Sequence, residues 1–256
     1  MRYGWDHPET VRYYELFSEH HIRYRHANEA LVARAELAPG QRILDIGAGT
    51  GRTAELALRA LEGDGAVVCV EPSAAMRAEG RTRLPHLHWR AEPPERDFFD
   101  RVLCGAAVWQ FAPLEATFAR VFDLLKDGGA FCFNIPSLYL GEPDEPGGGE
   151  DPMLQDLLAR LAKGRTPNAS ATPPPPDAHA IEGMLREIGF RPGRWRMRME
   201  LTQTALRDWL RIPVITDALL QDFSAAQRSA QIDEAFAGCD PASWRWEAWT
   251  GWTAWK

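Results

Sequence analysis

The chain has 256 residues, of which 45% are hydrophobic and 25% are charged, and its formal net charge is −7. The composition is that of an ordinary globular protein, and the length suffices for one domain with an elaboration or for two small domains. The acidic balance disfavours a nucleic-acid partner, which would favour a basic face, and no apolar run approaches the roughly 20 residues that cross a bilayer. We therefore expect a monomer or a homodimer with neither a nucleic-acid nor a membrane partner.

The first half of the chain predicts one helix followed by alternating strands and helices. Residues 8–36 read as a single helix, with Pro8 near its start and a break at 38–40. Strands are expected at 41–46, 66–71, 87–90, 101–108 and 130–136, with helices between them at 52–61, 74–83 and 113–125. This alternation predicts an α/β fold: a Rossmann-like doubly wound sheet with helices on both faces.

The second half departs from this alternation. Residues 141–177 form a mobile or proline-rich segment, of which 141–150 are rich in glycine, proline and acidic residues and are expected to be mobile. They include a helix predicted at 152–163 and four consecutive prolines at 173–176, a stiff extended spacer.

After the prolines, the pattern again indicates regular elements. Asp177 is expected to cap a helix that ends at Gly189, and a strand is expected at 194–201. Two or three short helices should fill 202–237, with Thr216 and Ser224 as caps and a break at Pro213. The last segment, 243–256, holds five of the ten tryptophans and reads as a final core strand.

The cysteines and the N-terminal residues bear on the compartment. Cys69, Cys104 and Cys132 lie inside expected core strands, whereas Cys239 stands alone. Because none has the spacing of a metal site or a redox motif, we predict free thiols and no bound metal. Free thiols, together with an N-terminus that lacks the apolar core of a signal peptide, lead us to expect a cytoplasmic protein.

The most informative segment is the decapeptide at 43–52, in which a buried strand runs into a glycine-rich turn and the start of a helix. Such a turn lets a ligand approach bare backbone at the carboxyl edge of a sheet. Its pattern is G-x-G-x-G, and Arg52 stands where a dinucleotide motif has its third glycine; no G-K-[ST] follows, which excludes a P-loop. Asp45, ahead of the glycines, would repel a pyrophosphate but suits a ligand with an ammonium and a sulfonium group. These features favour S-adenosylmethionine.

Three further landmarks follow in order along the chain. Glu71 ends the second expected strand and opens a turn of the D-x-S-x-x-M kind, Glu92 precedes the fourth expected strand, and Gly128 and Gly129 precede the fifth. With the glycine loop, they make the chain resemble the class I S-adenosylmethionine-dependent methyltransferases, most closely the small-molecule type that includes the ubiquinone/menaquinone and trans-aconitate methyltransferases. The resemblance covers about 40–136 well and 177–201 moderately, and it implies seven strands, the last of them antiparallel.

The resemblance also implies a role for each landmark. Asp45 would orient the methionine ammonium of the cofactor, and Glu71 would accept hydrogen bonds from both ribose hydroxyls. Met76 would lie under the adenine or be an ordinary core residue, and Glu92 would accept a hydrogen bond from the adenine amino group unless Glu95 takes its register. The cofactor-binding residues expected on this basis are Asp45, Gly47, Ala48, Gly49, Gly51, Glu71, Pro72, Met76, Glu92, Ala106 and Arg23.

Residues 106–111, just after the fourth expected strand, face the transferable methyl group in this fold. They lack the Asp/Asn-Pro-Pro-aromatic motif of enzymes that methylate adenine or amide nitrogens; the sequence at 134–136 is superficially similar but follows the fifth strand, and we discount it. Residues 106–111 are mainly apolar and aromatic, which suits a small, partly hydrophobic methyl acceptor. Trp109 is equally consistent with an ordinary residue of the hydrophobic core. The expected pocket residues are Tyr14, Trp109, Phe111 and Trp209.

At spacings of four, three and four, one face of the expected N-terminal helix carries aromatic and histidine side chains: Tyr13, Phe17, His20 and Tyr24. The stripe either docks the helix or forms a lid over the cofactor, in which Arg23 or Arg25 binds the methionine carboxylate. A base is needed only for a protonated acceptor, and the catalytic candidates are His20, His21 and Tyr24, with His26 also considered. We divide the chain into an N-terminal helical lid (1–39), a cofactor-binding core (40–201), a helical substrate-cap insertion (202–242) and a final core strand (243–256).

The sequence therefore predicts a methyltransferase that moves a methyl group from S-adenosylmethionine to a small molecule, such as a natural-product intermediate, and releases S-adenosylhomocysteine. The alternative is a cyclase or a regulatory protein of the same fold that binds the cofactor and transfers no methyl group. A nucleic-acid or protein methyltransferase is disfavoured by the acidic balance and by the missing motif after the fourth strand.

Overall fold

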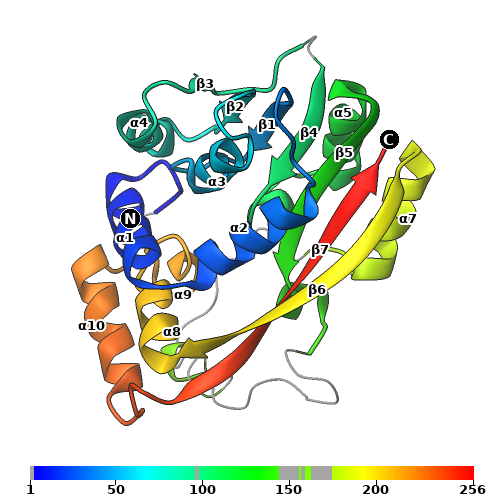
Figure 1. The fold of residues 1–256 in the computed structure, drawn as a ribbon. Helices are drawn as coiled ribbons and strands as arrows, with labels where there is room; N and C mark the ends of the chain where they lie inside the picture. Colours follow the sequence, from blue (N-terminus) through cyan, green and yellow to red (C-terminus); the bar gives the residue numbers. More distant parts are fainter. Residues whose placement is uncertain (1–2, 96–97, 144–155, 157–158, 163–174) are drawn as a thin grey trace. The chain divides into compact units, whose positions relative to one another are not determined.

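A seven-stranded sheet organises the computed structural model, which describes residues 3–95, 98–143, 156, 159–162 and 175–256 (Figure 1). The strands lie in the order β3-β2-β1-β4-β5-β7-β6. Their bounds are β1 (Arg42–Ile46), β2 (Ala66–Val70), β3 (His88–Arg90), β4 (Phe99–Cys104), β5 (Leu125–Pro136), β6 (Arg191–Thr202) and β7 (Trp244–Trp255). The first five strands pair in parallel, and β7 is antiparallel to β5. The predicted Rossmann-like sheet with seven strands and an antiparallel last strand is confirmed.

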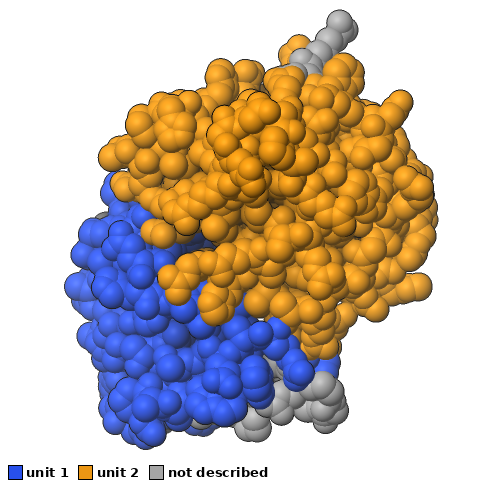
Figure 2. Space-filling view, in the orientation of Figure 1, with its two compact units in different colours: residues 1–23, 143–173, 198–247 blue, residues 24–142, 174–197, 248–256 orange. Residues whose placement is uncertain are grey.

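The chain divides into two compact units, which Figure 2 distinguishes by colour. Unit 1 comprises 1–23, 143–173 and 198–247, and unit 2 comprises 24–142, 174–197 and 248–256. Each unit has apolar clusters of its own.

Unit 2 contains two apolar clusters, and neighbouring residues along its strands contribute to them alternately. Ile43 packs with α2 (Arg23–Arg34) and α3 (Arg52–Ala60), whereas Leu44 packs with α5 (Leu114–Leu124) and α7 (Ala178–Ile188). In β5, Ala130 and Cys132 belong to the cluster with α2 and α3, whereas Phe131, Phe133 and Ile135 belong to the cluster with α5 and α7. Because successive side chains of a strand point to opposite faces, the central strands are buried on both sides, as a doubly wound sheet requires.

Local caps set the ends of several helices of unit 2 where the sequence predicted them. Ser73 accepts a hydrogen bond from the Met76 amide and begins α4 (Ala74–Arg83). Asp177 likewise accepts one from the Ala180 amide at the start of α7, and Gly189, with φ 116°, ends that helix.

The predicted single helix at 8–36 is wrong: the structure has two helices, α1 (Pro8–His20) and α2. His21 is extended, with φ −125° and ψ 144°, and its amide donates to the Phe17 carbonyl that ends α1. The side chain of His21 hydrogen-bonds Asp208, and that of Arg23 pairs with Glu247. These distant contacts outweigh the weak local preference for a continuous helix, so Tyr24 does not share a helix with the other members of the predicted stripe.

The fourth and fifth strands also differ from their expected ranges. β4 ends at Cys104, because Gly105 and Ala106, the latter with φ 54°, leave the strand before a short 3-10 turn, η1 (Val108–Gln110). β5 begins earlier than expected, at Leu125, and its pairing with β4 shifts register between Phe99 and Arg101.

Unit 1 is helical around its own apolar cluster. It contains α1, α8 (Gln203–Leu210), α9 (Asp217–Leu220) and α10 (Ala225–Phe236), and the predicted cap Ser224 forms a capping box with Gln227. Arg228, fully buried, donates to the Pro213 carbonyl and pairs with Asp217 at 2.9 Å. Short helices were expected over this segment, and the structure confirms them.

Several expectations fall partly outside the described residues. Of the segment at 141–177, the residues 144–155, 157–158 and 163–174 lie outside, including two of the four prolines; within the predicted helix at 152–163, the described residues 156 and 159–162 are helical. All four cysteines are free, and three of them are buried in strands. Over the described ranges, no helix combines the length and apolarity that crossing a bilayer requires.

Candidate cofactor site

The glycine turn after β1 has the backbone that its sequence predicted. Gly47, Gly49 and Gly51 have φ values of 67°, 56° and 86°, a region that side chains disfavour. A Cβ built on Gly47 would lie 2.8 Å from the Cβ of Ala107 and 3.1 Å from Cζ of Phe111. The loop after β4 packs directly on the backbone of Gly47, so only glycine fits there.

Asp45 lies at the end of β1, just before this turn, and is fully buried. Neither carboxylate oxygen makes a hydrogen bond of normal geometry to a described residue. Burial raises the pKa of Asp45 to about 8. The nearby Ala54 backbone lowers this pKa in part, whereas the negative charge of Glu71 raises it further. A buried carboxylate without donors is costly, so the position suits a ligand that brings a positive charge and N–H groups.

Glu71 follows β2 and connects two loops at the same edge of the sheet. Its Oε2 accepts a hydrogen bond from the Gly49 amide and its Oε1 one from the Ser73 amide, both at 2.8 Å. These bonds fix the carboxylate against the glycine turn and the start of α4. A carboxylate oxygen can accept more than one hydrogen bond, so that the predicted acceptance of two ribose hydroxyls stays compatible with both bonds.

The remaining expected cofactor residues of unit 2 differ in exposure. Met76, in the first turn of α4, is 2% exposed, whereas Pro72 and Glu92 are exposed. Ala48 is buried in the glycine turn, and its amide donates to the Val70 carbonyl. Their individual contacts with a cofactor stay predictions.

The loop after β4 is held by a residue that the sequence analysis set aside. Asn134 of β5 is fully buried; its Oδ1 accepts from the Ala106 amide at 2.8 Å and its Nδ2 donates to the Ala27 carbonyl at 2.9 Å. It thus joins α2 to the loop that covers Gly47. The sequence at 134–136 had been discounted as a binding motif, and a lone buried asparagine gives no other local signal.

The aromatic residues of this loop, Trp109 and Phe111, are partly buried. Phe111 packs beside Gly47, and Trp109 meets Tyr139 edge-on, with ring centroids 5.3 Å apart. Tyr24, in α2, is 7% exposed and meets Trp249 edge-on at 6.5 Å.

The residues of unit 2 fit S-adenosylmethionine. The buried Asp45 side chain offers a partner to an ammonium group, and the glycine turn beside it presents backbone without side chains. Glu71 offers acceptors at the neighbouring strand end, the place where ligands bind in sheets of this kind. Asp45, the glycine turn and Glu71 are the residues that would hold the cofactor.

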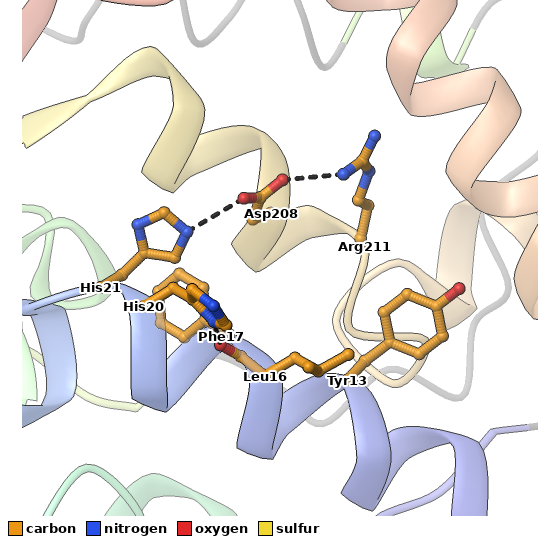
Figure 3. Close-up of a pocket in the computed structure, with 7 residues that line it drawn as sticks. All are labelled: Tyr13, Leu16, Phe17, His20, His21, Asp208 and Arg211. Atoms are coloured by element: carbon orange, nitrogen blue, oxygen red, sulfur yellow. Dashed lines mark hydrogen bonds and ion pairs between the residues drawn. The ribbon is translucent and has the colours of Figure 1, made fainter.

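In unit 1, two of the catalytic candidates line a recess of about 260 Å³ (Figure 3). Tyr13, Leu16, Phe17 and His20 project from α1, Asp208 projects from α8, and Arg211 directly follows α8. His21 Nε2 lies 3.0 Å from Asp208 Oδ2, and Arg211 donates to the other oxygen of Asp208 at 2.9 Å. The recess thus has an apolar floor and a charged wall.

The ion pairs of this wall fix the charge of Asp208. Against the effect of burial, hydrogen bonds from His21 and Arg207 and the positive charges of Arg207 and Arg211 lower the pKa of Asp208 to about 2. The carboxylate is therefore ionised at neutral pH and orients the His21 ring through Nε2. His20 differs, since its Nδ1 lies 2.7 Å from the Leu16 carbonyl oxygen of its own helix.

Arg23, the expected partner of the methionine carboxylate, is engaged elsewhere in unit 1. Its Nε lies 2.9 Å from both carboxylate oxygens of Glu247, and its guanidinium covers the ring of Trp209 at 4.4 Å. A role for Arg23 in cofactor binding would require this buried pair to open. Tyr14, the other expected pocket residue of unit 1, meets Trp5 edge-on at 6.0 Å.

Comparisons with known proteins identify a methyltransferase family. A family model described as a methyltransferase domain matches residues 18–192. A ubiquinone/menaquinone biosynthesis C-methyltransferase of Vibrio parahaemolyticus is 29% identical over 168 residues, which cover 59% of this chain and 65% of that protein, less than two thirds of its length. A trans-aconitate 2-methyltransferase of Variovorax paradoxus is 28% identical over 249 residues, 81% of this chain and 94% of that protein.

The fold has a counterpart among solved structures. A phosphoethanolamine N-methyltransferase of Haemonchus contortus, solved with phosphomonomethylethanolamine and S-adenosylhomocysteine, has a TM-score of 0.52 and 20% identity, over 90% of this chain and 52% of that one. At this identity the likeness concerns the fold.

Proposed function

The chain belongs to the methyltransferase domain family, whose cofactor is S-adenosylmethionine, and we propose that it transfers the cofactor's methyl group to a small, partly hydrophobic molecule. An intermediate of natural-product biosynthesis, in the cytoplasm, is the acceptor class that we propose. The relatives named as ubiquinone/menaquinone and trans-aconitate methyltransferases act on small molecules by their names, which supports this class over a nucleic acid or a protein.

The observation that carries the proposal is the buried Asp45 side chain at the edge of the glycine turn, whose oxygens make no hydrogen bond of normal geometry to a described residue, although the Ala54 backbone lies close. A phosphate-bearing dinucleotide would meet repulsion there, whereas an ammonium group would supply the missing donors. Glu71, held by two backbone amides, adds acceptors suited to a ribose.

The chemistry asks little of the protein beyond placement. Bound S-adenosylmethionine supplies a methyl group that its sulfonium already activates. Orienting the acceptor in line with that methyl group contributes much of the rate, on the order of 7–11 kcal/mol in favourable intramolecular models. The apolar residues of the loop after β4, Trp109 and Phe111, would exclude water from the reacting atoms.

For an acceptor that must lose a proton, we propose His21 as the general base and keep His20 and Tyr24 as further candidates. Asp208 holds Nε2 of His21 and so favours one tautomer of the ring, leaving Nδ1 for proton exchange. A carboxylate–histidine pair of this kind stabilises the ring after it accepts a proton.

The test uses methyl-labelled S-adenosylmethionine and a metabolite extract of the source organism, with the small-molecule fraction searched for label. We expect a labelled product with the wild-type chain and about a hundredfold less with Asp45→Asn. Cofactor binding in calorimetry without any labelled product would instead support a cyclase or a regulatory protein. Label in nucleic acid or protein, or the absence of any cofactor binding, would contradict the proposal.

A further inference from the structure

Helix α2 brings a second buried acceptor to the cofactor end of unit 2. Asn28 is 4% exposed, and its Oδ1 has no hydrogen-bond partner among the described residues. A Cβ built on Gly105 would lie 2.6 Å from this oxygen and 2.5 Å from Oγ1 of Thr53. Asn28 Oδ1 therefore lies directly beside the backbone of Gly105, where β4 ends.

Asp45 presents its carboxylate on the same face of the sheet. Ile43, two residues earlier in β1, packs in the cluster that contains α2 and α3, and the alternation of a strand puts Asp45 on that side. The backbone of Ala54 in α3 lies close to the Asp45 carboxylate, and Thr53, the preceding residue, lies beside Gly105. The first turn of α3 thus links the surroundings of the two side chains.

Asn134 fixes the position of α2 at this place. Its Nδ2 donates to the carbonyl of Ala27, the neighbour of Asn28, at 2.9 Å, while its Oδ1 holds the Ala106 amide next to Gly105. Asn28 is therefore held in position by a buried hydrogen bond to the adjacent residue, as a binding group must be.

The buried oxygens of Asp45 and Asn28 have one chemical property in common: they make no hydrogen bond of normal geometry to a described residue, although the Ala54 backbone lies close to Asp45. Unsatisfied buried acceptors are rare in proteins because their desolvation is not repaid. The group that satisfies them must carry several N–H donors, and the carboxylate favours one with a positive charge. An ammonium group has three N–H donors and no acceptor.

We propose that Asn28 accepts a hydrogen bond from the ammonium group of the cofactor's methionine portion, alongside Asp45, so that α2 contributes directly to cofactor affinity. The inference rests on the proposed function because it assumes the same cofactor. It does not depend on which molecule accepts the methyl group. It assigns a binding role to an element outside the glycine loop and the strand ends from which the cofactor site was built.

Two ligands and three variants test the proposal by calorimetry. S-adenosylhomocysteine has the amino-acid portion, and methylthioadenosine has the same nucleoside and thioether without it. For Asn28→Ala we expect about tenfold weaker binding of S-adenosylhomocysteine and unchanged binding of methylthioadenosine. Asn28→Asp, which keeps an oxygen at the same place, should retain the affinity for S-adenosylhomocysteine. Glu29→Ala, at an exposed position of the same helix, is the matched control and should leave both affinities unchanged.

The pattern separates a binding role from a structural one. Equal weakening of both ligands in Asn28→Ala, or weakening in Asn28→Asp as large as in Asn28→Ala, would show that Asn28 only supports the fold and would overturn the proposal. Unchanged binding of S-adenosylhomocysteine in Asn28→Ala would overturn it as well. A wild-type chain that binds neither ligand would contradict the proposed function itself, and the inference with it.

Discussion

The side chain of Asn134 holds Ala106 in a backbone conformation that alanine disfavours. Its Oδ1 accepts the Ala106 amide at 2.8 Å, and Ala106 has φ 54°. A non-glycine residue in this region is strained by about 1–2 kcal/mol, so the loop after β4 depends on the bond to keep its shape over the glycine turn.

Removing this side chain should loosen the cofactor site, and a glycine at 106 should restore it. We expect Asn134→Ala to lower the free energy of unfolding by about 2–3 kcal/mol, because the Ala106 amide and the Ala27 carbonyl lose their partner. S-adenosylhomocysteine should bind about tenfold more weakly. In the double variant with Ala106→Gly, glycine adopts the positive φ freely, and the affinity should recover more than the stability. Calorimetry and urea unfolding measure the two effects; an Ala106→Gly substitution without any rescue would contradict this role of Asn134.

Much of the fold followed from local sequence. The Ser73 and Asp177 caps and the stop at Gly189 each depend on residues a few positions apart, and each occurs where it was predicted. Asp45 and the glycine turn could be proposed as cofactor-binding residues for the same reason, since both belong to one continuous decapeptide.

The features that the sequence did not reveal depend on contacts between distant residues. The break after α1 accompanies bonds from His21 to Asp208 and from Arg23 to Glu247, partners 187 and 224 residues away. Asn134 bonds Ala106 and Ala27, which are 28 and 107 residues distant. A single polar residue inside an apolar strand has no motif around it, and only the folded chain shows what it holds.

The glycine turn offers a matched pair of substitutions. Gly47 and Gly63 both have positive φ, 67° and 84°, but a Cβ would meet Ala107 at 2.8 Å in the first case and nothing within 4 Å in the second. Gly63→Ala should therefore cost only backbone strain, about 1 kcal/mol. Gly47→Ala adds a clash with the loop after β4, and we expect a larger loss of stability and at least about a tenfold loss of affinity for S-adenosylhomocysteine. Equal effects of the two substitutions, in thermal unfolding and calorimetry, would show that no close packing protects this turn.

Asp45 should make the ligand-free chain less stable as pH rises. Burial raises its folded pKa to about 8 from its ordinary value of 3.8, so between these values the folded state binds one proton more than the unfolded state. The stability that this proton contributes is present in full below about pH 4 and is lost as pH rises to about 8, with a slope of at most about 1.4 kcal/mol per pH unit.

Asp45→Asn removes this titration and provides the test. In urea unfolding without ligand, the variant should gain stability over the wild type as pH rises from about 5 to about 8 and no more beyond that. Added S-adenosylhomocysteine should stabilise the wild type and much less the variant, because the ammonium group loses its carboxylate. A constant difference between the two proteins over this pH range would mean that Asp45 is ionised in the ligand-free fold.

The pair of Arg23 and Glu247 predicts how unit 1 responds to the loss of one charge. Their side chains are 7% and 5% exposed and lie 2.7 Å apart at the closest, and Arg23 also covers the Trp209 ring. Arg23→Met leaves the Glu247 carboxylate buried without its main partner, and we expect the free energy of unfolding to fall by about 3–5 kcal/mol. The double variant Arg23→Met, Glu247→Leu removes both charges and should recover most of the loss.

Arg12→Met, which breaks the exposed pair with Glu9 at 3.2 Å, is the control and should cost less than about 1 kcal/mol. Urea unfolding compares the three proteins, and a double variant as unstable as Arg23→Met alone would show that the guanidinium stabilises the unit by packing on Trp209 rather than through its charge. Titration of the folded double variant with S-adenosylhomocysteine then separates this structural role of Arg23 from the predicted binding role. If Arg23 also binds the methionine carboxylate, its loss in the double variant should lower the affinity for S-adenosylhomocysteine.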